Sequence, residues 1–144
     1  ITTDLVVVGG GFTGCSTALF AAKNGLSVTL IDQKIGYGGS GRNVGLVNAG
    51  LWMPTEKVES ILGLDAGVKL NNALATAPDL VFSLIDSNQI NCSANRSGTL
   101  HCAHSEKGLK DLRLRFKQLS ERGSDVELLD KKHTQQRIGS SKFF

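Results

Sequence analysis

The feature that most constrains the fold is residues 4–32, where an apolar run, a glycine-rich turn, a helical segment and a second apolar run follow one another. The first run, residues 5–8, has the length and composition of a buried parallel strand. Gly25 stands where the helical segment should end, and the second run closes at Asp32. This order of elements predicts a βαβ unit with two parallel strands.

The turn of this unit carries glycine at Gly9, Gly11 and Gly14, in the pattern G-x-G-x-x-G. The first glycine permits a sharp turn, the second lets a pyrophosphate approach the backbone, and the third lets the helix pack closely on the strand. N–H groups and the dipole at the helix start stabilise such an anion. The pattern predicts a dinucleotide site that includes Phe12 and Thr13. A purely structural glycine turn is the alternative.

Asp32 follows the last glycine of the turn by eighteen residues. Its carboxylate can accept hydrogen bonds from a ribose 2′-OH, whereas it would repel a 2′-phosphate, so NADP is disfavoured. We assign the next residue, Gln33, to the same site.

A second glycine-rich segment, residues 36–50, follows directly and reads GYGGSGRNVGLVNAG. A plain NAD-binding fold has no use for a second such loop at this place. With the βαβ unit, this segment and a Ser-Gly-Thr-Leu-His sequence at residues 97–101, the chain resembles the D-amino acid oxidase-like (DAO) family of FAD-dependent amine and amino-acid oxidoreductases. The resemblance covers essentially the whole chain. Its Ser-Gly-Arg-Asn version is most similar to the γ-glutamylputrescine oxidases and L-pipecolate oxidase-like enzymes.

The resemblance implies that FAD is the cofactor and that part of the second segment lines its flavin side. Arg42 can offset phosphate charge and Asn43 can donate and accept hydrogen bonds, which agrees with that role. A flexible glycine loop with a solvated arginine is the alternative. The segment has no His or Cys, so covalent attachment of flavin there is not expected. The residues assigned to the flavin side are Ser40, Gly41, Arg42, Asn43, Gly45 and Leu46.

The function implied by the resemblance is oxidation of the C–N bond of a small amine or amino acid, with hydride transfer to the flavin. No catalytic side chain can be named in this chain. Two alternatives stay open. One is a non-catalytic flavin- or nucleotide-binding subunit completed by a partner chain, and the other is an NAD-binding protein of plain Rossmann type.

The predicted fold class is α/β, a Rossmann-type parallel sheet with helices on it. We expect residues 1–93 to be an incomplete FAD-binding domain and residues 94–144 to begin a mixed α+β substrate domain. Members of the resembled family are usually far longer, so we expect a fragment that is inactive alone. One face of its sheet should be uncovered and could support self-association.

Local signals predict the remaining elements. Proline at Pro54 indicates a helix entry, Pro78 should kink or break a long helical pattern, and Ser105 and Asp130 are expected to cap the last two helices. The expected helices cover residues 53–62, 65–88 and 105–123 and a short terminal stretch after residue 130, and the expected strands cover residues 100–103 and 126–129.

Composition excludes several classes of function. The net charge is +3, and no apolar run reaches the length of a membrane span; with no signal peptide, a cytoplasmic setting is expected. Residues 107–142 are basic, but the charges fall on the outer side of an amphipathic helix, where no aromatic residues interleave with them as stacking platforms, which favours a solvated helix face over nucleic-acid binding. His101, His104 and the three cysteines lack metal-ligand spacing, so no metal is expected and the cysteines should be reduced.

Overall fold

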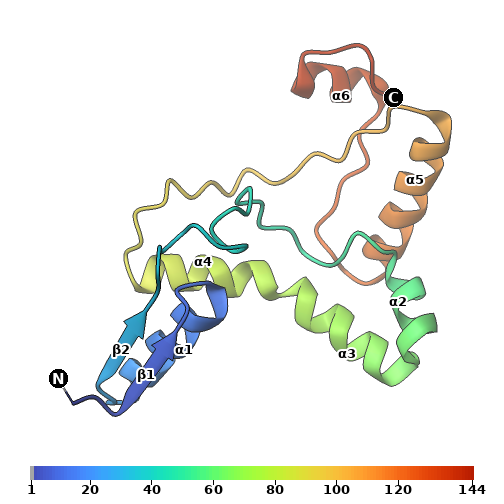
Figure 1. Ribbon diagram of the computed structural model, residues 1–144. Helices are drawn as coiled ribbons and strands as arrows, with labels where there is room; N and C mark the ends of the chain where they lie inside the picture. The colour runs from blue at the N-terminus through green and yellow to red at the C-terminus, as the bar shows by residue number, and fades with distance from the viewer. Residues whose placement is uncertain (1) are drawn as a thin grey trace. The chain divides into compact units, whose positions relative to one another are not determined.

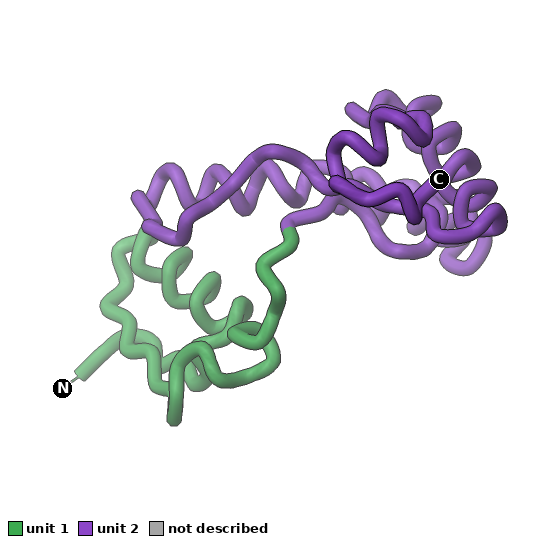
Figure 2. Tube along the Cα trace, turned by 90° about the horizontal axis from the view of Figure 1, so that it is seen from above, with its two compact units in different colours: residues 1–46 green, residues 47–144 purple. Residues whose placement is uncertain are grey.

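The computed structural model describes residues 2–144, so Ile1 lies outside the described residues. Along the chain it has two strands and six helices (Figure 1): β1 (Leu5–Val8), α1 (Phe12–Lys23), β2 (Val28–Ile31), α2 (Thr55–Leu62), α3 (Leu64–Ala75), α4 (Ala77–Ser87), α5 (Glu106–Glu121) and α6 (Lys131–Ile138). The chain divides into two compact units, residues 1–46 and residues 47–144 (Figure 2). The predicted boundary at residues 93–94 rests on the polar, glycine-containing stretch 91–98 and on the family resemblance, and it stays a prediction.

The N-terminal unit is the predicted βαβ unit. β1 and β2 pair in parallel, with Leu5 opposite Val28 and Val8 opposite Ile31, and Figure 1 shows α1 alongside the pair. At the start of the strands, the Asp4 carboxylate accepts hydrogen bonds from the Ser27 N–H and hydroxyl at 2.9 and 2.6 Å. The prediction of a βαβ unit over residues 4–32 is therefore confirmed.

Burial of β1 alternates along the strand. Val7 is buried, whereas Val6 and Val8 are 50% and 83% exposed. The sequence predicts a buried strand, and the structure corrects this, since only one face of the two-stranded sheet is covered by α1. The expected uncovered face is present; self-association through it stays a prediction.

Within residues 47–144, the helix boundaries follow the local signals. α2 and α3 form a hairpin through Gly63, whose φ is 81°. α3 and α4 are separated at Thr76, and Pro78 lies in the first turn of α4, as predicted. The side chains of Ser105 and Asp130 accept hydrogen bonds from the third N–H of α5 and α6, so both predicted caps are confirmed.

The strands predicted at residues 100–103 and 126–129 are wrong: neither segment is a strand in the structure. An apolar extended segment becomes a strand only when its backbone pairs with a neighbour. The one sheet among the described residues is the β1–β2 pair, so neither segment has such a neighbour there. Among residues 2–144, no helix is both long and apolar enough to span a membrane.

Polar side chains tie α2 to α3 and α5. Arg122 donates to the two carboxylate oxygens of Glu59 at 2.8 and 3.0 Å, and the Asn71 amide donates to the same carboxylate at 3.0 Å. The Glu59 side chain is 12% exposed, and its hydrogen bonds to Arg122 lower the pKa of the Glu59 carboxyl below its ordinary range. Beside it, α3 approaches α2 so closely that a Cβ on Gly67 would overlap the Glu59 backbone.

We expect Gly67→Ala to lower the free energy of unfolding by about 1–3 kcal/mol, because α3 must move away from α2. Gly108→Ala in α5 is the matched control, since its Cβ would approach the Ser105 hydroxyl at 3.3 Å and the Ala103 Cβ and Cα at 3.7 and 3.8 Å without overlapping any backbone. Alanine is the better helix former by about 1 kcal/mol, so the control should be neutral or stabilising. Urea unfolding of both variants tests this, and equal stabilities would show that the two helices do not approach at Gly67.

Candidate cofactor-binding site

The end of β1 and the start of α1 are held together by a close backbone approach. Gly9 has a φ of 106°, a value that favours glycine, and its N–H donates to the Ile31 carbonyl at 2.7 Å. A Cβ on Gly14 would overlap the Gly9 carbonyl oxygen. The conformational roles predicted for these two glycines, the sharp turn and the close helix packing, agree with this geometry.

The N-terminus of α1 exposes N–H groups at the positive end of the helix dipole. Gly11 is the N-cap, and the first turn contains no acidic residue. The Phe12 N–H donates to the Ser40 hydroxyl at 3.1 Å, and the Cys15 N–H closes the first helical bond to Gly11. Within residues 2–144, the N–H groups of Thr13 and Gly14 have no hydrogen-bond acceptor. The helix start can therefore receive an anion.

The second glycine-rich segment reaches this helix start through Ser40. Its backbone folds tightly just before and after that residue, because a Cβ on Gly41 would overlap the Gly36 carbonyl. A Cβ on Gly11 would lie 3.1 Å from the Ser40 hydroxyl oxygen. The missing side chain at Gly11 thus makes room for Ser40 as well as for any phosphate, a second role that the sequence pattern does not reveal.

Asp32 binds the turn with both of its carboxylate oxygens. Oδ2 accepts a hydrogen bond from the Gly10 N–H at 2.6 Å, and Oδ1 accepts one from the Lys34 N–H at 2.7 Å. These bonds, the Gly10 bond most strongly, lower the pKa of the Asp32 carboxyl below its ordinary range. The residue is exposed, so its remaining lone pairs face solvent. Gly10 is a partner that the G-x-G-x-x-G pattern misses.

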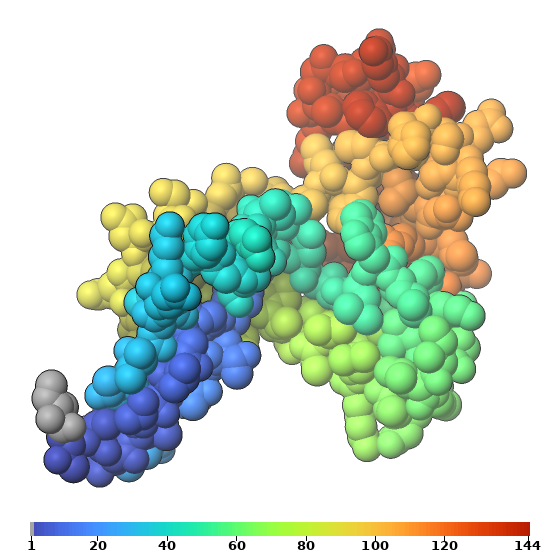
Figure 3. Space-filling model, in the orientation of Figure 1, coloured from blue at the N-terminus to red at the C-terminus, as the bar shows by residue number. Residues whose placement is uncertain are grey.

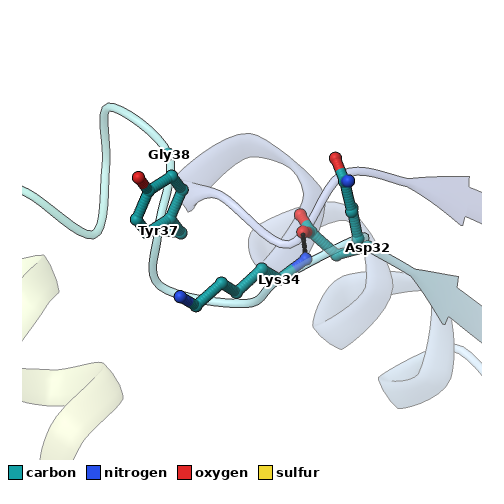
Figure 4. A pocket seen from close by; sticks show the side chains of 5 residues that line it. Asp32, Lys34, Tyr37 and Gly38 are labelled. Carbon is teal, nitrogen blue, oxygen red and sulfur yellow. Dashed lines mark hydrogen bonds between the residues drawn. The ribbon is translucent and has the colours of Figure 1, made fainter.

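A hollow of about 460 Å³ opens beside Asp32. Figure 4 shows the Lys34 side chain extending toward Tyr37, and its Nζ lies 4.5 Å from the centre of the Tyr37 ring. The predicted residues Asp32 and Gln33 line this hollow together with three residues that the sequence analysis did not single out, Lys34, Tyr37 and Gly38. The sequence feature that could have indicated this hollow is a lysine and a tyrosine, Lys34 and Tyr37, within a few residues of the end of β2.

The later part of the second segment forms its own turn. The Asn43 side chain accepts a hydrogen bond from the Gly45 N–H at 2.9 Å, and the Asn43 N–H donates to the Ser40 carbonyl at 3.2 Å. The side chains of Arg42 and Leu46 are exposed. In the part of the chain that the structure describes, no hydrogen bond or ion pair joins the side chains of Arg42 and Asn43 to the glycine turn. Their predicted place beside the flavin stays a prediction.

The described residues contain no group of three or more His, Cys, Asp or Glu side chains that could hold a metal ion. The His101 ring packs edge-to-face against the Trp52 ring.

Comparison with known proteins identifies a family whose model matches this chain. The family model described as FAD dependent oxidoreductase (DAO) matches residues 4–143. Gamma-glutamylputrescine oxidoreductase of Escherichia coli (strain K12) is 31% identical over 99% of this chain and 34% of its own length. The probable oxidoreductase OrdL of Rhizobium meliloti (strain 1021) is 29% identical over 97% of this chain and 33% of its own length.

A third relative is the mitochondrial L-2-hydroxyglutarate dehydrogenase of Caenorhabditis briggsae, 27% identical over 90% of this chain and 28% of its own length. The chain thus spans about a third of the length of these curated relatives. No solved structure matches it.

The Asp32 geometry predicts a pH dependence of stability. Because the pKa of this carboxyl is lower in the folded chain than in the unfolded chain, its contribution is present above about pH 4 and is lost as pH falls through the folded value. Carboxyl NMR should show Asp32 titrating below the ordinary range, with the Gly10 and Lys34 N–H resonances moving in the same transition. Asp32→Asn should reduce the loss of stability on acidification. An Asp32 carboxyl that titrates in the ordinary range would contradict the two hydrogen bonds.

Proposed function

The chain belongs to the FAD dependent oxidoreductase (DAO) family, and from that membership we propose that residues 9–46 bind FAD and that the protein oxidises the C–N bond of a small amine or amino acid. The observation that supports this proposal most directly is the start of α1, where two N–H groups without an acceptor, no acidic side chain and a glycine-lined approach fit a pyrophosphate.

The pyrophosphate is proposed to accept hydrogen bonds from the N–H groups of Thr13 and Gly14, beside the Cβ-free Gly11. Ser40 adds to this anion site. Its hydroxyl oxygen accepts from the Phe12 N–H at 3.1 Å, which leaves the hydroxyl proton free to be donated to a phosphate oxygen. In this way the second glycine-rich segment would contribute a donor to the first.

The adenosine end of FAD is proposed to lie at Asp32. Its carboxylate keeps lone pairs that face solvent, which can accept hydrogen bonds from the ribose hydroxyls. The adjoining hollow, with the Tyr37 ring and Gln33 at its walls, has the volume and the aromatic surface to receive the adenine. The remaining residues of the second segment, Arg42, Asn43, Gly45 and Leu46, are proposed to follow the cofactor toward its flavin end, as the family resemblance implies.

FAD, when bound, supplies the acceptor for a hydride from the substrate carbon. The residues of this chain bind and orient that cofactor: the helix start fixes the pyrophosphate and Asp32 fixes the ribose. The C–N bond is proposed as the one oxidised because the relative at 31% identity is named for gamma-glutamylputrescine, an amine. The worm relative is named for a hydroxy acid, so a C–O bond is the competing choice.

A second candidate is a flavin-binding chain that a partner completes. It is favoured by the exposed side chains of Val6 and Val8 on the uncovered face of the sheet, since apolar surface of this kind is usually covered.

The bond oxidised can be tested on the purified protein that contains these residues. Anaerobic mixing with gamma-glutamylputrescine should bleach the flavin absorption, because the flavin takes up the hydride, whereas L-2-hydroxyglutarate should leave it unchanged. Bleaching by the hydroxy acid and not by the amine would overturn the C–N assignment while leaving FAD binding intact. A protein without a flavin spectrum, even after incubation with FAD, would overturn the proposed function itself.

The contact between Gly11 and Ser40 decides how the pyrophosphate placement must be tested. Gly11→Ala alone is ambiguous, because its Cβ would crowd the Ser40 hydroxyl. We therefore compare Gly11→Ala/Ser40→Gly with Ser40→Gly alone, in which that crowding is absent. If the phosphates pass close to Gly11, the double variant should bind FAD at least about tenfold more weakly than Ser40→Gly, by fluorescence titration of FAD. Equal affinities would show that the Cβ at position 11 conflicts with Ser40 only.

A further inference from the structure

Three side chains from three separate segments meet in the 47–144 unit. The Trp52 ring has the His101 ring against it in an edge-to-face arrangement, with centroids 5.1 Å apart and planes at 74°. The Arg115 guanidinium of α5 lies over the Trp52 ring, 5.1 Å from its centre. Figure 3 shows the green-teal residues near position 50 meeting the orange residues beyond position 100 on one face of this unit. We call these three residues the Trp52 cluster.

The segments that carry the cluster are fastened next to it. The Thr99 hydroxyl donates to the Asn48 side chain at 2.7 Å, which joins the loop before α2 to the extended segment that carries His101. The Gly50 N–H donates to the Leu74 carbonyl at the end of α3. Both bonds fasten residues just before Trp52, so the segment that leads to the ring is held to the extended segment and to α3.

The Trp52 cluster has an exposed apolar ring and a guanidinium that no carboxylate among residues 2–144 pairs with. Trp52 is 80% exposed although it is the largest apolar side chain of the protein. Across residues 2–144, no carboxylate lies within ion-pair distance of Arg115. A guanidinium that rests on an indole ring is held in one orientation while its N–H fork remains able to bind a carboxylate bidentately. The His101 imidazole can add one N–H donor.

We propose that the Trp52 cluster is a binding site for a small organic acid, with the carboxylate on Arg115 and His101 and a flat apolar body on the exposed Trp52 ring. An inorganic anion would use only the donors and leave the indole in water. A neutral aromatic molecule would use only the indole and leave the guanidinium without a partner. The site lies wholly within residues 47–144 and shares no residue with the proposed FAD site, so its test does not depend on the proposed function.

Trp52 is the only tryptophan of the 144 residues, so intrinsic tryptophan fluorescence reports on this position alone. We expect phenylacetate to change the Trp52 emission saturably. Phenylacetamide, of the same shape without the charge, should bind at least about tenfold more weakly, because it loses the charge-assisted bonds to Arg115. Inorganic phosphate should not produce the saturable change. Equal binding of phenylacetate and phenylacetamide, or no saturable change with either, would overturn the proposal with no variant required.

Arg115→Gln should weaken phenylacetate at least about tenfold, and Arg115→Lys, which keeps the charge and loses the fork, should fall between. Arg113→Gln is the matched control, since it removes the same charge from an exposed position of the same helix, and it should leave the affinity unchanged. His101→Phe keeps a ring against Trp52 and should cost only a few-fold. Wild-type affinity in Arg115→Gln, or an equal loss in Arg113→Gln, would contradict a specific site.

Discussion

The N-terminal unit depends on the approach of the Gly14 backbone to the Gly9 carbonyl. The approach is possible only because residue 14 has no side chain, and it sets the start of α1 against the ends of β1 and β2. The ability of the α1 start to receive an anion follows from it. The free N–H groups of the first helical turn then lie at the edge of the sheet where β2 delivers Asp32, as the parallel register of the two strands requires.

The residues around this approach fall into two kinds, which a substitution experiment could easily confuse. Gly9, Gly14 and Gly41 are required by the backbone conformation itself, so their replacement would damage the unit whether or not a ligand binds. Thr13 instead offers a backbone N–H without an acceptor, and Asp32 keeps lone pairs toward solvent although both of its oxygens also bind the turn. If a variant at one of these three glycines loses the cofactor, the result can be explained by damage to the turn. It does not show that the glycine contacts the cofactor. A substitution at Thr13 keeps its N–H, and one at Asp32 also removes the bonds to Gly10 and Lys34. Evidence of contact therefore has to come from paired variants that remove the steric conflict.

Sequence reasoning succeeds here where the signal is local. The glycine turn, the caps at Ser105 and Asp130 and the helix break before Pro78 depend on neighbours within a few residues, and each is present. It fails where the outcome depends on a distant partner. Residues 100–103 and 126–129 have strand composition but no strand beside them in the described part of the chain. The Ser40 bond to the Phe12 N–H joins residues twenty-eight positions apart, so no local pattern could predict it.

Sequence patterns also miss contacts between single polar side chains, because such contacts depend on distant partners and do not repeat along an element. A hydrophobic face repeats along a helix and can be recognised, whereas Glu59 meets Arg122 and Asn71 at single points on three helices. The carboxylate of Glu59 is nearly enclosed and is satisfied by three donors, so its neighbours α2, α3 and α5 are held in one arrangement. Arg115 lies in α5, which ends just before Arg122; it has no such carboxylate in the described residues and lies over an exposed indole instead. The two arginines thus differ in what they contact: Arg122 closes a network with Glu59, and Arg115 lies over the Trp52 ring.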